Sequence, residues 1–503
     1  MTQHFDLLIR NGTIVDGTGA ARYEGDVAVC GERVSRIGEL SDCTATREID
    51  AKGLIVAPGF IDVHTHDDRM LLAEGDMVPK VSQGVTTVVA GNCGISLAPM
   101  PVPVSRPVLP PLDLLDASGE WYCYRSFAEY LAALGETPAA VNAAAYVGHT
   151  TLRAIVMDDL DRPASAAEVA RMQEMVAEAM EAGAIGVSTG LAYPPARAAT
   201  TEEVIEVCRP MVPHDGLHAT HMRDEGEATM ASLDETFAIG RALGVQTLIS
   251  HHKLAGAAAH GQSVATLRVI ADEMIRQKVS LDCYPYTASS TILTLEHAES
   301  SGRTLITWSR KRPEFSGRDL MDVMSELGCS MAEAVAQLQP AGAVYFRMHE
   351  DDVSRILSFD PTMIGSDGLP HDEFPHPRLW GTFPRVLGHY SRDRGLFTLE
   401  TAVHKMTGLT AAEIGFVDRG VLRAGAFADI TLFDAGLIRD QATFEEPTRR
   451  AEGIGAVLVN GVSVWEGDAP TGARPGRVLH RQRSPMQAPG ANTGSRAAVS
   501  TAG

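Results

Sequence analysis

Two histidines stand two residues apart in the segment Gly59-Phe-Ile-Asp-Val-His-Thr-His66. Side chains alternate between the two faces of a β-strand, so on a strand His64 and His66 would project to the same side, about 7 Å apart at Cα. Two imidazoles placed in this way can share one metal centre. The preceding residues are apolar on both faces, which is typical of a buried parallel strand. Spacing alone leaves open the alternative that both histidines face solvent at a strand end.

Other residues of metal-ligand and acid–base types follow further apolar segments. They are Cys93 in Gly91-Asn-Cys-Gly94, His221 in His218-Ala-Thr-His-Met222, His251 in Ile249-Ser-His-His-Lys253, and Asp367 in Gly365-Ser-Asp-Gly368. Imidazole and thiolate ligands favour zinc, and a catalytic zinc keeps an open position for water. Each residue alone is a weak signal, and Cys93 could instead be a small buried hydrophobe. By strand alternation His252 points away from His251, which favours a packing role.

These residues need a framework that brings distant strand ends together. After Pro58 apolar runs and helical patterns alternate, which indicates βα units with a parallel sheet. Eight strands are expected at Phe60 to His66, Val85 to Gly91, Val141 to Gly148, Ala184 to Gly190, Leu217 to Met222, Val245 to His251, Val279 to Tyr284, and Thr362 to Asp367. We therefore predict an α/β fold of the (β/α)8 type, a TIM-like barrel, whose functional residues lie at the carboxyl ends of the strands.

The barrel is expected to occupy residues 58–411. Strands seven and eight are separated by over 70 residues, too many for a plain connection, so residues 288 to about 345 are predicted to form an inserted subdomain that caps the barrel mouth. Residues 1–57 and 412–480 contain short strands, with Asn-Gly turns at Asn11 and Asn460, and are predicted to pair into one small β-sandwich. Residues 481–503 are predicted to be a disordered tail.

The composition argues against several classes of partner. The 64 acidic residues exceed the 43 basic ones and give a net charge of −21, which would repel nucleic acid and anionic membranes. The chain shows no run of 18 apolar residues and no secretory leader, so a cytoplasmic protein that acts on a small molecule is expected. The seven cysteines are scattered without CxxC pairs, which argues against a disulfide framework. The oligomeric state stays open.

Several of these motifs together resemble a known family. They are Gly59-Phe-Ile-Asp-Val-His-Thr-His66, Gly91-Asn-Cys-Gly94, Thr220-His-Met-Arg223, Ser250-His-His-Lys253, Asp282-Cys-Tyr-Pro-Tyr286, Gly365-Ser-Asp-Gly368 and His376-Pro-Arg-Leu-Trp-Gly-Thr-Phe-Pro-Arg385. From about residue 5 to 470 the chain resembles the amidohydrolase superfamily, specifically its N-acyl-D-amino-acid deacylase (D-aminoacylase) branch. The His-x-His motif alone would indicate only the superfamily, whereas the cysteine after strand two, the Ser-His-His-Lys motif and the Arg378 segment are more specific.

The resemblance implies a particular set of metal ligands. One zinc ion would be held tightly by Cys93, His221 and His251, and a second, weaker metal position would use His64, His66 and the shared Cys93. Many relatives in the superfamily bridge two metals with a carboxylated lysine on strand four. The fourth strand here, residues 184–190, has no lysine, so Cys93 is expected to take the bridging role.

The resemblance also implies an activity, the zinc-dependent hydrolysis of the amide bond of N-acyl-D-amino acids to a carboxylate and a free D-amino acid. Metal-activated water is the expected nucleophile and Asp367 the general base and acid, with a turn-forming aspartate as the alternative. Tyr193 is similar to a family tyrosine that polarises the acyl carbonyl. The preference for the D form is inherited from the resemblance alone.

The α-carboxylate of such a substrate requires cationic and hydroxyl partners. The segments similar to the family's carboxylate clamp supply Arg378, Lys253, Tyr284 and Ser289, although both cations could instead be surface charges. His149 is a weaker candidate for substrate binding and could be only a residue of the barrel mouth. The preferred side chain is expected to depend on the insertion, on Thr291 to Glu296 and Arg303, and the sequence does not reveal it.

Two other interpretations stay open. A cyclic-amide hydrolase of the dihydroorotase or hydantoinase type shares the barrel and the His-x-His motif, but the missing strand-four lysine and the presence of Cys93 argue against it. A non-catalytic amidohydrolase-like scaffold would have no reason to keep the histidines at 64, 66, 221 and 251 together with Asp367. Zinc content would separate the scaffold from an enzyme.

Overall fold

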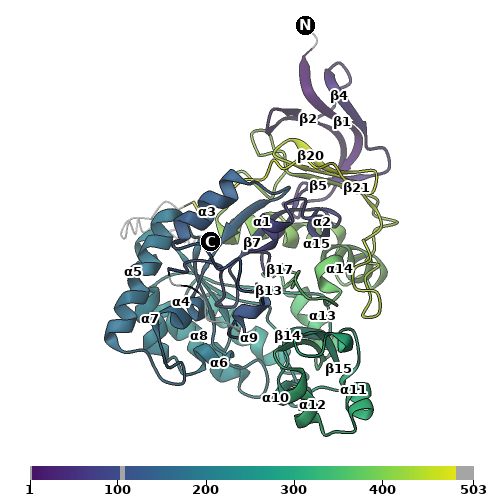
Figure 1. Cartoon of the computed structure of the whole chain (residues 1–503). Helices are drawn as coiled ribbons and strands as arrows, with labels where there is room; N and C mark the ends of the chain where they lie inside the picture. Colours follow the sequence, from purple (N-terminus) through teal and green to yellow (C-terminus); the bar gives the residue numbers. More distant parts are fainter. Residues whose placement is uncertain (1–2, 102, 104–107, 483–503) are drawn as a thin grey trace, which may run out of the picture.

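The computed structural model describes residues 3–101, 103 and 108–482 (Figure 1). At its centre eight parallel strands enclose a barrel: β6 (Phe60–Asp62), β7 (Val85–Ala90), β8 (Asn142–Ala145) continued by β9 (Val147–Gly148), β10 (Gly186–Gly190), β11 (Leu217–His221), β12 (Thr247–Ile249), β13 (Val279–Cys283) and β17 (Thr362–Ile364). Each strand pairs in parallel with its neighbour, and the ring closes where Thr65, beyond β6, pairs with Gly368, beyond β17. The eight predicted strands are therefore all present.

Helices surround this barrel because each presents one apolar face to the strands. They include α4 (His149–Val156), α5 (Ala166–Ala182), α7 (Thr201–Cys208), α8 (Thr229–Leu243), α9 (Ser263–Met274), α13 (Glu350–Ser358) and α15 (Leu399–Met406). In α5 the Ser165 side chain and Glu168 form a capping box, Met172 and Val176 are buried, and Gly183 ends the helix in the left-handed conformation. Across the described residues, no helix combines the length and apolar character that a membrane span requires.

The first barrel strand is shorter than the sequence pattern indicates. β6 ends at Asp62, so His64 and His66 lie on the segment beyond the strand rather than on one face of it. Only Thr65 between them returns to strand pairing, through its bridge to Gly368. The two imidazole rings still lie close, with centroids 5.8 Å apart. The expected proximity of His64 and His66 is therefore observed, on the two sides of the bridged residue Thr65 beyond the end of β6.

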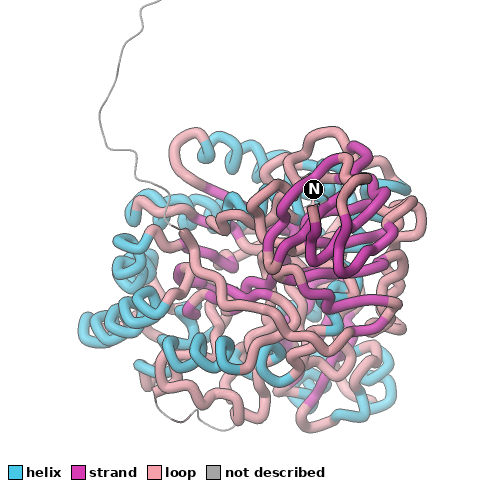
Figure 2. The backbone as a smooth tube through the Cα atoms, turned by 90° about the horizontal axis from the view of Figure 1, so that it is seen from above, coloured by secondary structure: helices cyan, strands magenta, loops and turns pink. Residues whose placement is uncertain are grey.

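Strands from both ends of the chain form one sheet of nine strands, which lies above the barrel in Figure 1 and in front of it in Figure 2. Its strands are β1 (His4–Ile14), β2 (Tyr23–Cys30), β3 (Arg33–Gly38), β4 (Thr44–Asp50), β5 (Ile55–Pro58), β18 (Ile430–Phe433), β19 (Ile454–Val459), β20 (Val462–Glu466) and β21 (Ala469–Pro470). The antiparallel pairing of β5 with β18 joins the two ends of the chain. One cluster of buried residues, among them Ile9, Val27, Ile430 and Leu458, packs this sheet.

The two Asn-Gly sequences have different structures. Asn460-Gly461 makes the predicted turn, between β19 and β20, and both residues have positive φ. Asn11-Gly12 does not turn the chain, because β1 runs through it. Asn11 has φ 59°, and the register of β1 against β2 shifts between Ile9 and Gly12, as in a β-bulge. The bulge lets the one strand pair with β4 before it and with β5 after it, which the prediction of a hairpin missed.

The insertion between β13 and β17 has a small core of its own. Its elements are β14 (Ala288–Ile292), α10 (Leu295–Glu299), β15 (Thr304–Ser309), α11 (Leu320–Leu327), α12 (Met331–Leu338) and β16 (Ala341–Phe346). The strands form an antiparallel sheet in the order β14-β16-β15, and Phe315, Leu320 and Leu338 are buried against it. These elements lie together at one end of the barrel (Figure 1).

Candidate metal centre

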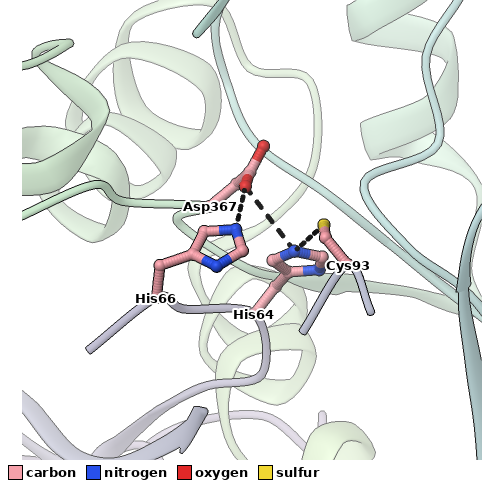
Figure 3. Close-up of side chains that lie close together, drawn as sticks. All are labelled: His64, His66, Cys93 and Asp367. Atoms are coloured by element: carbon pink, nitrogen blue, oxygen red, sulfur yellow. Dashed lines mark hydrogen bonds and ion pairs between the residues drawn. The ribbon is translucent and has the colours of Figure 1, made fainter. Parts of the chain in front are cut away.

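Five candidate ligands and Asp367 meet at the carboxyl ends of the barrel strands, in two groups that share Cys93. His64, His66, Cys93 and Asp367 form one group, and Cys93, His221 and His251 form the other, each with donor atoms within 4.8 Å of one another. The Cys93 sulfur lies 3.3 Å from His64 Nε2 and 3.3 Å from His251 Nε2. His251 Nε2 lies 3.0 Å from His221 Nδ1. Figure 3 shows the first group, in which Cys93 and Asp367 both approach the same ring nitrogen of His64, Nε2.

The backbone at three of these positions adopts a left-handed conformation. Cys93 has φ 54°, His251 has φ 37° and Asp367 has φ 50°, although none is a glycine. Such conformations cost free energy and persist where surrounding contacts enforce them, often at functional sites. A glycine on β10 makes room for one of them, because a Cβ atom at Gly190 would lie only 2.1 Å from the Cys93 carbonyl oxygen. The close approach of β10 therefore constrains the backbone at Cys93.

The electrostatics of the site fit a bound cation. Burial lowers the pKa of His64 to about 3 and that of His221 well below its ordinary value, so both imidazoles are neutral donors. Burial, followed by the charge of Asp367, raises the pKa of the Cys93 thiol well above its ordinary value, so a thiolate here needs a nearby positive charge. Buried His66 Nδ1 has no hydrogen-bond partner among the described residues. A thiolate with neutral imidazoles is a donor set that suits zinc.

Glu225 and Lys253 lie directly behind His251. The Glu225 carboxylate is 3.0 Å from His251 Nδ1 and accepts a hydrogen bond of 2.6 Å from Lys253 Nζ. Lys253 Nζ is also 2.7 Å from His251 Nδ1. A carboxylate on the outer nitrogen of a ligating histidine fixes the ring and its tautomer, which leaves Nε2 free to face the metal. Lys253, predicted to bind a substrate carboxylate, is thus also tied to the ligand His251.

Asp282 contacts one histidine of each donor group. One carboxylate oxygen accepts the His251 backbone N–H at 3.0 Å, and the other lies 3.4 Å from His64 Nδ1. Complete burial raises the pKa of Asp282 to about 7. Asp282 belongs to a motif of the family resemblance from which no role for it is predicted, and Glu225 is not predicted from the sequence at all. The available signal for Glu225 was its position four residues after His221, just beyond a strand end.

Asp367 lies between the histidines and an arginine. Its Oδ1 is 3.3 Å from His66 Nε2 and 3.5 Å from His64 Nε2, and its Oδ2 is 2.8 Å from Arg378 Nη1. Burial alone would raise the pKa of Asp367, but the Arg378 guanidinium and the neighbouring imidazoles hold it well below its usual range. Asp367 is therefore an ionised carboxylate, which can accept a proton.

A cavity of about 590 Å³ opens onto the site. Predicted residues that line it are His66, Tyr193, His221, His251, Lys253, Ser289 and Asp367, together with Thr291, Ile292, Thr294 and Glu296 of the insertion. The Tyr193 hydroxyl lies 3.1 Å from Thr291 Oγ1, and its ring packs on His221 with centroids 4.9 Å apart. The insertion thus forms one wall of the cavity.

Other predicted substrate-binding residues lie at different depths. Arg378 is 1% exposed and stacks over the ring of Tyr284, with Cζ 4.6 Å from the ring centroid. Ser289 accepts a hydrogen bond from Arg347 at 3.3 Å. Neither Arg378 nor Tyr284 is among the residues that line the cavity. His149 also lies outside them, buried 3.5 Å from the Glu203 carboxylate. Arg303 pairs with Asp319 inside the insertion.

Comparisons with known proteins agree with this geometry. A family model described as amidohydrolase family matches residues 47–465. Three proteins of Alcaligenes xylosoxydans xylosoxydans are similar along almost their whole length. A D-aminoacylase is 59% identical to this chain, and the match covers 95% of this chain and 98% of the relative. An N-acyl-D-aspartate deacylase is 51% identical, with 94% of this chain and 95% of the relative covered. An N-acyl-D-glutamate deacylase is 46% identical, with 97% of this chain and 99% of the relative covered.

Two solved structures superpose closely. A D-aminoacylase structure concerned with the functional role of its binuclear metal center has a TM-score of 0.92 at 56% identity, over 95% of this chain and 100% of that one. N-acyl-D-glutamate deacylase from Bordetella bronchiseptica, complexed with zinc and a phosphonate inhibitor, has a TM-score of 0.91 at 46% identity with the same coverage. This chain therefore belongs to the amidohydrolase family, and within it to the branch of D-aminoacylases and other N-acyl-D-amino-acid deacylases.

Proposed function

We propose that this protein hydrolyses the amide bond of N-acyl-D-amino acids to a carboxylate and a free D-amino acid, with zinc as its cofactor. The observation that carries the proposal is the pair of donor groups sharing Cys93, with the ionised Asp367 beside them. Support comes from relatives named for deacylation of D-amino acids, and from the Bordetella bronchiseptica enzyme, whose bound phosphonate mimics the tetrahedral intermediate of the reaction.

We assign the tight zinc site to Cys93, His221 and His251, and a second, weaker site to His64, His66 and Cys93. The related D-aminoacylase is described as having a binuclear centre with one-metal activation and second-metal attenuation, which fits one essential and one accessory position. Bound zinc would supply a Lewis acid for the scissile carbonyl and lower the pKa of a coordinated water. β10 carries no lysine, so Cys93 is the donor common to both positions.

Asp367 is assigned the proton transfers. Its carboxylate is ionised and faces the histidine side of the centre, so it can accept a proton from the attacking water and return it to the leaving nitrogen. Arg378 keeps that carboxylate charged, because its guanidinium lies 2.8 Å away. Tyr193 reaches into the cavity above His221 and is assigned to the acyl carbonyl.

The carboxylate of the substrate is assigned to the cations and hydroxyls around Arg378. Arg378 Nη2 donates a hydrogen bond to the Ser290 carbonyl at 3.1 Å, whereas Arg378 Nε has no hydrogen-bond partner among the described residues. Lys253, Tyr284 and Ser289 complete this clamp. The insertion at about 288–345 is proposed to cap the site, and residues 1–57 with 412–480 to form its supporting sheet. His149 keeps only a supporting role near the barrel mouth.

The test is a substrate panel on purified protein. N-acetyl derivatives of D- and L-amino acids, hydantoin and dihydrouracil are assayed before and after zinc is removed by a chelator and restored. We expect hydrolysis of the N-acetyl-D-amino acids only, lost with the metal and recovered with one equivalent of zinc. A preference for the cyclic amides, or a zinc-loaded protein without any activity, would overturn the proposal.

A further inference from the structure

A fully buried lysine lies behind the metal centre, and none of the assigned roles uses it. Lys80 belongs to the short helix α2 (Val78–Val81) and is 0% exposed. Its Nζ lies 2.9 Å from Asp62 Oδ2, 3.0 Å from Ser366 Oγ and 3.2 Å from Asp67 Oδ2. An uncompensated ammonium is costly to bury, so these partners hold Lys80 in a defined position.

The partners of Lys80 belong to both sides of the barrel seam, where β6 and β17 meet. Asp62 ends β6, and Ser366 follows β17. Asp62 Oδ1 accepts the Ser366 backbone N–H at 2.8 Å, and the His64 backbone N–H is 3.4 Å away. The only strand pairing across this seam in the described residues is the Thr65–Gly368 bridge. Beside the backbone hydrogen bonds of this bridge, Lys80 and Asp62 add side-chain contacts that join the two mouth segments.

The seam also sets the position of Asp367. Ser366 Oγ accepts a hydrogen bond from Lys80 Nζ and another from the Gly368 backbone N–H at 3.2 Å. The residues before and after Asp367 are therefore held together. The Asp367 N–H donates to the His64 carbonyl at 2.8 Å. Asp367 needs such support, because its left-handed φ of 50° is unfavourable for any residue with a side chain.

We propose that Lys80 is a positioning residue for the deacylation reaction: through Ser366 and Asp62 it locks the Asp367 segment against the His64 segment. This inference rests on the proposed function for its kinetic readout. The charge of Lys80 persists because Asp62 and Asp67 outweigh the effect of burial and raise its pKa. A displacement of Asp367 by a fraction of an ångström would slow proton transfer while leaving the tight zinc ligands in place.

The chain offers a matched control in a second buried lysine. Lys405 of α15 is 1% exposed and donates to the carbonyls of Phe359, Asp360 and Thr362, at the opposite end of β17. Its replacement removes a buried ammonium of the same barrel without touching the mouth. Both substitutions remove a buried ammonium. Lys80→Met also leaves the carboxylates of Asp62 and Asp67 unpaired, and it alone removes a contact with the Asp367 segment.

The experiment compares Lys80→Met, Ser366→Ala and Lys405→Met as zinc-loaded proteins. Ser366→Ala leaves Lys80 and both carboxylates paired, so it decides the question if Lys80→Met fails to fold. We expect kcat to fall about tenfold or more in the first two variants, with KM within about threefold and the tight zinc retained, because Asp367 is displaced. In Lys405→Met kcat stays within about threefold of the parent.

A second readout does not depend on activity. Because Asp367 belongs to the donor group of the weaker site, titration with zinc beyond one equivalent should show about tenfold weaker binding in Lys80→Met and Ser366→Ala than in Lys405→Met. Parent-like kcat and parent-like second-site affinity in Ser366→Ala, or equal losses in all three variants, would overturn the role of Lys80. A parent protein without deacylase activity would instead overturn the proposed function, and the titration would still test Lys80.

Discussion

Replacing Glu225 by glutamine tests how the ligand His251 is oriented. The substitution keeps the shape of the side chain but removes the charge that faces His251 Nδ1 at 3.0 Å and Lys253 Nζ at 2.6 Å. Outer partners of metal-ligating histidines are worth roughly 10–100-fold in metal affinity. That range corresponds to about 1.4–2.8 kcal/mol. We expect zinc binding by Glu225→Gln to weaken by this amount.

The same change should also destabilise the metal-free protein. Lys253 is 3% exposed, so loss of Glu225 leaves its ammonium buried without a carboxylate, at a cost of about 3–5 kcal/mol. The double variant Glu225→Gln/Lys253→Met removes both charges and should recover most of the stability while its zinc affinity stays low. Lys253→Met alone should lose stability but keep zinc affinity within about threefold, because Glu225 still faces His251.

The assay is a competition titration against a chromophoric zinc chelator, with thermal unfolding of the metal-free proteins alongside. We expect the zinc affinity to fall wherever Glu225 is replaced, and the stability of the metal-free protein to fall wherever only one of the two charges is removed. If Glu225→Gln binds zinc as tightly as the parent, or if Lys253→Met loses as much affinity as Glu225→Gln, then the carboxylate does not orient His251 and the reasoning fails.

Three further predictions follow from the site and its surroundings. Asp367→Asn should retain zinc yet lose about 10²–10⁴-fold in kcat/KM, because the amide cannot accept the proton, and near-normal hydrolysis of an N-acetyl-D-amino acid would contradict this. Cys93→Ala should lose stoichiometric zinc, as measured by elemental analysis, since both donor groups share that sulfur, and a retained equivalent would refute the ligand assignment. Burial raises the pKa of Asp113 from 3.8 to about 7, so the stability from its neutral form is complete below about pH 4 and lost as pH rises through 7. Asp113→Asn should therefore stabilise the protein by ~2–3 kcal/mol more at pH 8 than at pH 5 in urea unfolding, and a pH-independent difference would disprove it.

The barrel was predictable because its signal is local. Strands of a parallel sheet are buried on both faces and rich in apolar residues, although β10 and β11 also bury polar side chains. Each of the eight runs contained a buried strand, with ends only a few residues from those expected. The site residues could be proposed for the same reason, since strand ends of a barrel converge on one mouth. Their grouping around Cys93 needed only that convergence, and the structure brings all five candidate ligands together.

The remaining features depend on contacts between distant segments. The residues next to Glu225 and Lys80 in the sequence do not predict which side chains these two contact. Their partners His251 and Ser366 follow other strands of the barrel. His149 directly follows β9, where a residue of the barrel mouth is expected, yet it begins α4 and is turned toward Glu203 of α7. The Asn11-Gly12 pair suits either a hairpin or a bulge, and the choice depends on two later strands, β4 and β5.

The pairing of β5 with β18 has a consequence for biosynthesis. Residues 55–58 leave the ribosome about 370 residues before their partners at 430–433. At a translation rate of roughly 5–20 residues per second, the amino-terminal strands would expose the unpaired, apolar edge of β5 for on the order of 20–70 s. Production of this protein should therefore be sensitive to chaperone supply and to the speed of translation, even though the finished molecule seals that edge.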